Sequence, residues 1–160
     1  MSLAVREAEG LRDMNVAREL FAEYQRGLGV DLCFQGFDGE LASLPGRYAR
    51  PSGRLLFAAE GDRVLGVVAL RALEGGDCEM KRLYVRPAGR GFGIGRMLAG
   101  RLIDEARLAG YNRMLLDTLP SMANAQALYR SMGFFEIAPY CANPIAGTLY
   151  MALQLATAPP

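Results

Sequence analysis

The sequence predicts an α/β fold with one mixed sheet, and three patterns support this prediction. Apolar strand-like runs follow one another between residues 54 and 85, joined by short turns. A glycine-rich stretch then leads into an amphipathic helical pattern, and another apolar run follows that helix. A strand, a helix and a second strand in this order indicate two parallel neighbours joined by a right-handed crossover.

The first third of the chain predicts a strand, a long helix and a loop-rich segment. Residues 4–8 alternate between apolar and polar side chains, as a short strand does. A helical pattern runs from about Arg12 to Arg26 and stops at residues 27–29. From Asp31 to Ser52, aromatic and leucine residues are interrupted by glycine and proline, which favours one or two short helices under loops.

A change of periodicity marks the strand predicted at residues 78–85. Cys78 and Met80 point to one face of the strand, and strict alternation would put the next apolar residues at even positions. The apolar residues Leu83 and Val85 are instead three and five residues after Met80. A β-bulge shifts the side-chain alternation by one residue in this way. We therefore expect a bulge around Lys81 to Leu83.

The C-terminal half predicts two helices and three further strands. The expected elements are a helix at 94–109, a buried strand at 113–118, a helix with its N-cap at Ser121 and its end at Gly133, and an antiparallel pair at 134–137 and 147–155. No linker interrupts these elements, so we expect one domain over residues 1–156 and a short tail at 157–160.

Composition narrows the classes of function. The chain of 160 residues has 18 basic and 17 acidic side chains, so its net charge of +1 creates no general attraction to nucleic acid or to an anionic membrane. The absence of histidine and the wide spacing of the three cysteines argue against a metal site and against Ser-His or Cys-His catalysis. No signal peptide or transmembrane pattern is evident, so we expect a cytoplasmic protein.

The glycine-rich stretch at residues 89–95 is the strongest candidate binding site. Glycines let backbone N–H groups converge, and those at a helix N-terminus carry partial positive charge that favours phosphate. Arg90 and Arg96 add guanidinium donors. Two other interpretations are open: a tight turn without a ligand, and a dinucleotide site with Asp117 on a ribose. The second is weaker, because Arg96 stands where that motif needs its third glycine.

Two motifs resemble the signatures of the GNAT superfamily of N-acetyltransferases. Leu83-Tyr84-Val85-Arg86-Pro87 leads to Arg90-Gly91-Phe92-Gly93-Ile94-Gly95, which is similar to the family's R/Q-x-x-G-x-G/A acetyl-CoA motif. Ala127-Leu128-Tyr129-Arg130-Ser131-Met132-Gly133-Phe134 is similar to its L-Y-x-x-x-G-F signature. The resemblance covers nearly the whole chain. It implies a GNAT-like fold of about seven strands, with a central parallel pair splayed at a β-bulge and helices on both faces.

The resemblance also implies roles for single residues. Backbone groups of Leu83 and Val85, with Tyr84 between them, would pair with the pantetheine arm of acetyl-CoA. The pyrophosphate would be held by the turn and the start of the helix, namely by Arg90, Gly91, Phe92, Gly93, Ile94, Gly95 and Arg96. The chain departs from the family at Met122, where an asparagine often contacts the cofactor. Asn124 lies about 200° further around a helix, so it cannot simply substitute.

Amine acetylation needs a base and an acid. An alkyl ammonium with a pKa of about 10.4 must lose a proton before it attacks a thioester, which costs roughly 4 to 5 kcal/mol at pH 7. The resemblance implies that Tyr129 lies beside the thioester sulfur, where its phenol could protonate the thiolate. Glu79, on the strand beside the expected splay, is the candidate base, directly or through a water. Alternatively, Glu79 is solvated or paired with Lys81 or Arg82.

The sequence therefore predicts an N-acetyltransferase that moves an acetyl group from acetyl-CoA to a primary amine by direct attack in a ternary complex. The alternative is a non-catalytic acyl-CoA-binding or sensing domain on the same fold. The acceptor, a small molecule or a protein amine, stays open, although the resemblance implies that residues 33–48 and 140–144 border its pocket. A monomer and a homodimer are both compatible with the sequence.

Overall fold

The computed structural model describes residues 2–29 and 36–156, which form a seven-stranded sheet in the order β1-β2-β3-β4-β5-β7-β6. The strands are β1 (Ala4–Glu7), β2 (Arg54–Glu60), β3 (Arg63–Ala72), β4 (Cys78–Val85), β5 (Arg113–Thr118), β6 (Phe135–Ile137) and β7 (Leu149–Gln154). Only β4 and β5 are parallel neighbours among these described strands. The predicted mixed sheet is confirmed.

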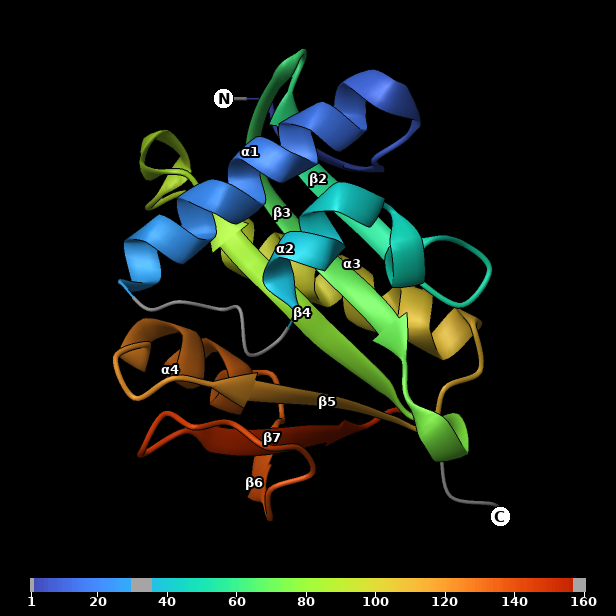
Figure 1. The fold of residues 1–160 in the computed structure, drawn as a ribbon, viewed down its shortest axis with the longest axis vertical. Coiled ribbons are helices and arrows are strands. Elements are labelled where there is room, and N and C mark those ends of the chain that lie inside the picture. Colours follow the sequence, from blue (N-terminus) through green and yellow to red (C-terminus); the bar gives the residue numbers. More distant parts are fainter. Residues whose placement is uncertain (1, 30–35, 157–160) are drawn as a thin grey trace.

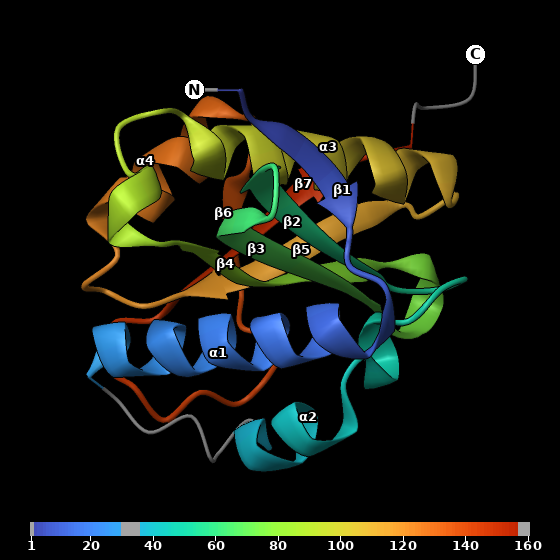
Figure 2. The same ribbon diagram turned by 90° about the horizontal axis from the view of Figure 1, so that it is seen from above.

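Helices cover both faces of the sheet, as predicted (Figure 2). In the described part of the chain, α1 (Gly10–Leu28) and α2 (Phe37–Ser43) lie on one face, and α3 (Ile94–Leu108) and α4 (Ala123–Ser131) lie on the other. Neighbouring residues of β2 serve different cores, since Phe57 packs on the α1 side and Leu56 on the α3 side. Burial on both faces explains why β2 and β3 are apolar along nearly their whole length.

The start of α4 differs from the prediction. The chain makes a turn in which the Met122 N–H donates to the Leu119 carbonyl (3.0 Å), and the Met122 carbonyl then accepts the N–H of Gln126 (3.0 Å). The helix therefore begins after Met122, and the prediction of an N-cap at Ser121 is wrong. No helix within residues 2–29 and 36–156 has the length and apolar character needed to cross a bilayer. Residues 31–35 of the predicted loop-rich segment lie outside the described residues.

The predicted bulge is present in β4. Val67 of β3 pairs with Tyr84, and Ala69 pairs with Lys81, so β4 has one residue more than β3 in this interval. The extra residue falls beside Arg82, whose φ of 59° is in the left-handed region that side chains other than glycine rarely adopt.

The two central strands separate just before this bulge. Among the described residues, β4 pairs with β5 only at Cys78 and Glu79, opposite Met114 and Leu115. Figure 1 shows β4 and β5 together at one end and diverging toward the end where α4 lies. The predicted splay of the central parallel pair is confirmed.

Helix α3 approaches β3 closely where it begins. A Cβ at Gly66 would lie 3.0 Å from side-chain carbons of both Ile94 and Leu98. Glycine is therefore needed at this position of β3 so that the helix can pack directly on the sheet. This contact holds the start of α3 beside the end of β4.

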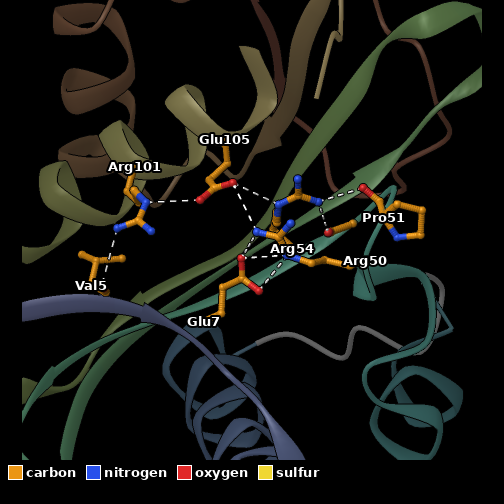
Figure 3. Close-up of polar contacts among 8 residues, drawn as sticks. Val5, Glu7, Arg50, Pro51, Arg54, Arg101 and Glu105 are labelled. Carbon is orange, nitrogen blue, oxygen red and sulfur yellow. Dashed lines mark hydrogen bonds and ion pairs between the residues drawn. The ribbon is translucent and has the colours of Figure 1, made fainter. Parts of the chain in front are cut away.

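A network of ion pairs joins β1, the segment before β2 and α3 (Figure 3). Glu105 contacts Arg54 (3.1 Å), Arg101 (3.3 Å) and Arg50 (3.8 Å), and Arg50 also binds Glu7. Arg54 and Glu105 are both buried, and the Arg54 guanidinium also donates to backbone carbonyls. The network therefore ties the β1 edge of the sheet to α3.

Candidate active site

The separation of β4 and β5 opens a small cavity between them. Residues from α1, β4, β5 and α4 line it, among them Tyr24, Leu83, Asp117 and Tyr129. Its volume of about 30 Å³ is enough for a water molecule. Since β4 has no β5 partner past Glu79 in the described sheet, its backbone edge can pair with an extended ligand.

A larger groove continues from this gap toward the start of α3. The groove has a volume of about 390 Å³, with Tyr84, Val85 and Arg90 on one side and residues of α4 on the other. Four residues line both the gap and the groove: Tyr24, Leu28, Leu83 and Met122. The two spaces therefore adjoin, and together they are called the path, whose smaller end is lined by Tyr129.

The glycine-rich turn brings helix N–H groups to the wide end of this path. Gly91 and Gly93 have φ angles of 87° and 72°, which glycine adopts without strain. The turn leads into α3, and N–H groups in the first turn of a helix lack intrahelical acceptors and carry partial positive charge. Gly95 lines the groove itself. The predicted phosphate-binding residues are therefore grouped where an anion could enter the groove.

The other predicted binding residues differ in which of their groups a ligand in the groove could reach. Arg90 lines the groove, and its Nε donates to the Val85 carbonyl (3.3 Å). The Arg96 guanidinium donates to the Ser131 hydroxyl (2.7 Å). Phe92 is 54% exposed, whereas the side chain of Ile94 is buried in the core, so that only the backbone of Ile94 is available to a ligand.

Tyr129 places a buried phenol in the gap. The residue is 5% exposed, and its ring packs on Phe134 with centroids 5.7 Å apart. Its hydroxyl has no hydrogen-bond partner among the described residues, and burial raises the pKa of the Tyr129 phenol above its ordinary value. This phenol stays protonated at neutral pH and can donate a proton or hydrogen bond to a group in the gap.

Glu79 is the last residue of β4 that pairs with β5, and the gap begins there. It is 1% exposed; its Oε1 accepts from Arg71 Nε (2.7 Å) and its Oε2 accepts from the Tyr140 hydroxyl (2.5 Å). The alternative expectation of a solvated Glu79 is wrong, because Arg71 and Tyr140 bind its buried carboxylate. The reason is the register of the hairpin, since Arg71 pairs directly opposite Glu79.

The bulge residue Arg82 is held by α2 instead. Its guanidinium binds both carboxylate oxygens of Glu40 (2.9 and 3.1 Å) and lies over the ring of Phe37, 5.0 Å from its centroid. Glu40 also accepts the Tyr48 hydroxyl (2.8 Å). These contacts stabilise a backbone conformation that is otherwise unfavourable.

Asp117 lies in the gap and not at the glycine-rich turn. Its carboxylate accepts from the Asn143 side chain (3.1 Å), which comes from the connection between β6 and β7. This position argues against Asp117 as the ribose ligand of a dinucleotide site. Asn143 belongs to the segment 140–144 that was expected to border the pocket, whereas sequence reasoning gave no place in the site to the buried Lys81, which also lines the gap.

Arg71 and Tyr140 were not predicted as partners of Glu79. The tight turn at residues 74–76 could have indicated Arg71, because counting outward from the pair Leu73 and Asp77 sets Arg71 opposite Glu79. No local pattern indicates that the chain after β6 brings Tyr140 back to β4. Within the described residues, no group of three or more Cys, Asp or Glu side chains is arranged to hold a metal ion.

Met122 and Asn124 both line the groove, in contrast to the helical-wheel expectation. Met122 precedes α4 and has φ and ψ of −97° and 52°, so the helical rotation between the two residues does not apply. Asn124 is therefore on the groove side after all.

Three features define an acyltransferase fold of the GNAT type. The mixed sheet opens at a bulge, a groove leads from this opening to a helix N-terminus, and a buried phenol lies at the narrow end of the groove. A family model described as the Acetyltransferase (GNAT) family matches residues 14–134. The chain belongs to this family, and the predicted resemblance is confirmed.

Relatives cover nearly the whole chain. An uncharacterised N-acetyltransferase of Schizosaccharomyces pombe is 42% identical over 146 residues, which is 90% of each chain. A GNAT acetyltransferase structure from Staphylococcus aureus has the same fold, with a TM-score of 0.81 at 18% identity, covering 97% of this chain and 100% of that one. The structure of yncA from Salmonella typhimurium, solved with its cofactor acetyl-CoA, has a TM-score of 0.74 at 26% identity and covers 100% of this chain and 98% of that one.

Proposed function

We propose that the protein transfers an acetyl group from acetyl-CoA to a primary amine in a ternary complex. The observation that carries this proposal is that the groove beside the α3 N-terminus adjoins the gap at Tyr129, along the edge of β4 that β5 leaves unpaired. A donor with a charged end and a long, thin arm fits such a path. The acetyl-CoA bound to the similar yncA structure supports the same donor here.

The chain offers separate groups to each part of this donor. N–H groups of the turn and the first residues of α3 would hold the pyrophosphate, with the Arg90 guanidinium beside them. Backbone groups of Leu83 and Val85 would pair with the arm, and Asn124 adds a polar side chain to the groove. Acetyl-CoA would supply the activated thioester at the narrow end.

Tyr129 acts as the acid in this proposal. The thiolate of a thiol with a pKa of about 8.5 is a weaker base than the phenolate of a phenol with a pKa of about 10, so the phenol assists the departure of the thiolate without protonating it completely. Burial raises the pKa of the Tyr129 phenol, so the hydroxyl is protonated over the whole neutral range and serves the departing thiolate mainly as a hydrogen-bond donor. Its hydroxyl does not have to break a hydrogen bond to another described residue before it donates.

Glu79 acts as the base, through Tyr140 or a water. Since Arg71 and Tyr140 each hold one oxygen of its carboxylate, an amine would reach the Tyr140 hydroxyl rather than Glu79 itself. The amine's proton would pass to the Tyr140 oxygen while the Tyr140 proton moves to Glu79 Oε2. Arg71 keeps the carboxylate oriented for this transfer.

Thiol release from acetyl-CoA over a panel of amines tests the proposal. The panel would contain polyamines, amino acids, aminoglycosides and peptides with a free N-terminus or lysine, because small-molecule and protein acceptors both fit the proposal. We expect amine-dependent release together with CoA binding in calorimetry. Tight CoA binding without release for any amine would instead favour the sensing domain.

A further inference from the structure

We propose that the protein acetylates its own Lys81 when acetyl-CoA is bound and no acceptor amine is present. This inference rests on the proposed function, because it uses the same donor and the same gap. It assigns a modification site and a self-limiting reaction in addition to transfer to an external amine.

Lys81 is the only lysine in the chain. The other 17 of the 18 basic residues are arginines, whose guanidinium groups stay protonated and are not acylated under physiological conditions. Apart from the N-terminus, the chain thus has a single primary amine. The residue that carries this amine is buried and lines the active-site gap.

The geometry brings the Lys81 side chain to the reacting end of the path. Lys81 belongs to β4 beside the bulge, is 8% exposed, and lines the same cavity as Leu83 and Tyr129. The cavity has a volume of only about 30 Å³. A thioester led along β4 toward Tyr129 would share this small space with the lysine amine, and confinement of two reactants greatly raises their effective concentration.

The charges around Lys81 favour its neutral, nucleophilic form. Burial lowers the pKa of Lys81 most, and the neighbouring positive charges of Arg82 and Arg71 lower it further. Glu79 and Asp117 act in the opposite direction, and the net result is a pKa below the ordinary value of lysine. The neutral fraction of Lys81 is therefore larger than that of an exposed lysine at the same pH.

The reaction is balanced with the groups already described. The Lys81 nitrogen forms a bond to the thioester carbonyl carbon, the carbon–sulfur bond breaks, and its electron pair leaves on the sulfur. Tyr129 gives its proton to the thiolate, and the proton lost from the lysine nitrogen replaces it on Tyr129 through water. The products are an acetamide on Lys81 and free CoA. Loss of the charge and the added bulk in the gap would lower later turnover.

Intact-mass spectrometry tests the inference. The full-length protein is incubated with acetyl-CoA and no amine, and peptide mapping distinguishes Lys81 from the N-terminus. We expect a gain of one acetyl group at Lys81, at a rate that is independent of protein concentration and that is slowed by CoA or by an accepted amine. The Lys81→Arg variant keeps the positive charge but has no amine, so it should bind CoA and gain no acetyl group at this position.

Four results would overturn the inference, and only the last of them would also remove the proposed function. Lys81 could stay unmodified in a sample that releases thiol with an amine, which would leave the proposed function intact. Modification could proceed equally fast in urea-unfolded protein, which would make it non-enzymatic. Its rate could also rise with protein concentration, which would place the reaction between molecules. Absence of both CoA binding and thiol release would remove the proposed function together with the inference.

Discussion

Replacing Tyr129 with phenylalanine tests the acid role, because the change removes a single oxygen atom. The ring contact with Phe134 remains, and the lost hydroxyl has no hydrogen-bond partner among the described residues. The free energy of unfolding should therefore change by less than about 1 kcal/mol. The CoA affinity should be preserved, since the groups proposed to hold CoA are backbone amides and Arg90.

The expected loss of turnover follows from the leaving group. Positioned acids contribute about 10²- to 10⁴-fold in rate, and a thiolate of pKa about 8.5 leaves more readily than an alkoxide. We therefore expect the lower end, a fall in kcat of about 10²-fold, or about 2.7 kcal/mol. Because burial raises the pKa of the Tyr129 phenol, the wild-type rate should rise with pH as the amine deprotonates and show no alkaline fall below about pH 9.

The assay combines thiol release at saturating acetyl-CoA, CoA titration calorimetry and thermal unfolding. Tyr111→Phe is the matched control, because Tyr111 is outside the gap and groove and its hydroxyl donates to the Ser52 carbonyl. That variant should lose some stability and keep its turnover. A Tyr129→Phe protein within about threefold of wild type in kcat would refute the acid role, and an equal loss of kcat and CoA affinity would assign Tyr129 to binding.

The remaining predictions concern the base, the anion site and the ion network. Glu79→Gln keeps the shape of the side chain but removes the proton acceptor, so kcat at pH 7 should fall by about 10²- to 10⁴-fold, and Asp117→Asn should cost much less in the same assay. In Gly93→Ala the new side chain meets no other atom, but the φ of 72° becomes unfavourable by about 1–2 kcal/mol. The turn should therefore adopt its binding conformation less often, and calorimetry should show a CoA affinity about tenfold weaker. Glu105→Leu leaves Arg54 buried without its carboxylate, which should lower the free energy of unfolding in urea titrations by about 3–5 kcal/mol; adding Arg54→Met should recover most of this loss.

Results opposite to these would contradict the physical explanation given for each variant. A larger loss of kcat in Asp117→Asn than in Glu79→Gln would move the base from β4 to β5. Unchanged CoA affinity in Gly93→Ala would contradict an anion site built on the conformation of the turn. A double variant at positions 54 and 105 that is no more stable than Glu105→Leu alone would mean that the loss does not come from the unpaired arginine.

Local patterns predicted the parts of the site that depend on the backbone. The slip in alternation after Met80 indicated the bulge, because a strand's side-chain period is a property of the strand itself. The glycine pattern indicated the turn before α3, because the turn needs left-handed backbone angles at Gly91 and Gly93, and glycine adopts these angles whatever the rest of the fold. The prediction at Ser121 was wrong because the turn from Leu119 to Met122 delays the helix.

The sequence alone determined the mixed sheet, the bulge, the glycine-rich turn and the helix that carries Tyr129, because these follow from periodicity and from backbone angles within short segments. Only the tertiary structure decided that Arg71 and Tyr140 hold Glu79, and that Lys81 and Asp117 lie in the gap with Tyr129. Those contacts join side chains from β3, β4, β5, α4 and the connection after β6, and their distances depend on how all of these elements pack.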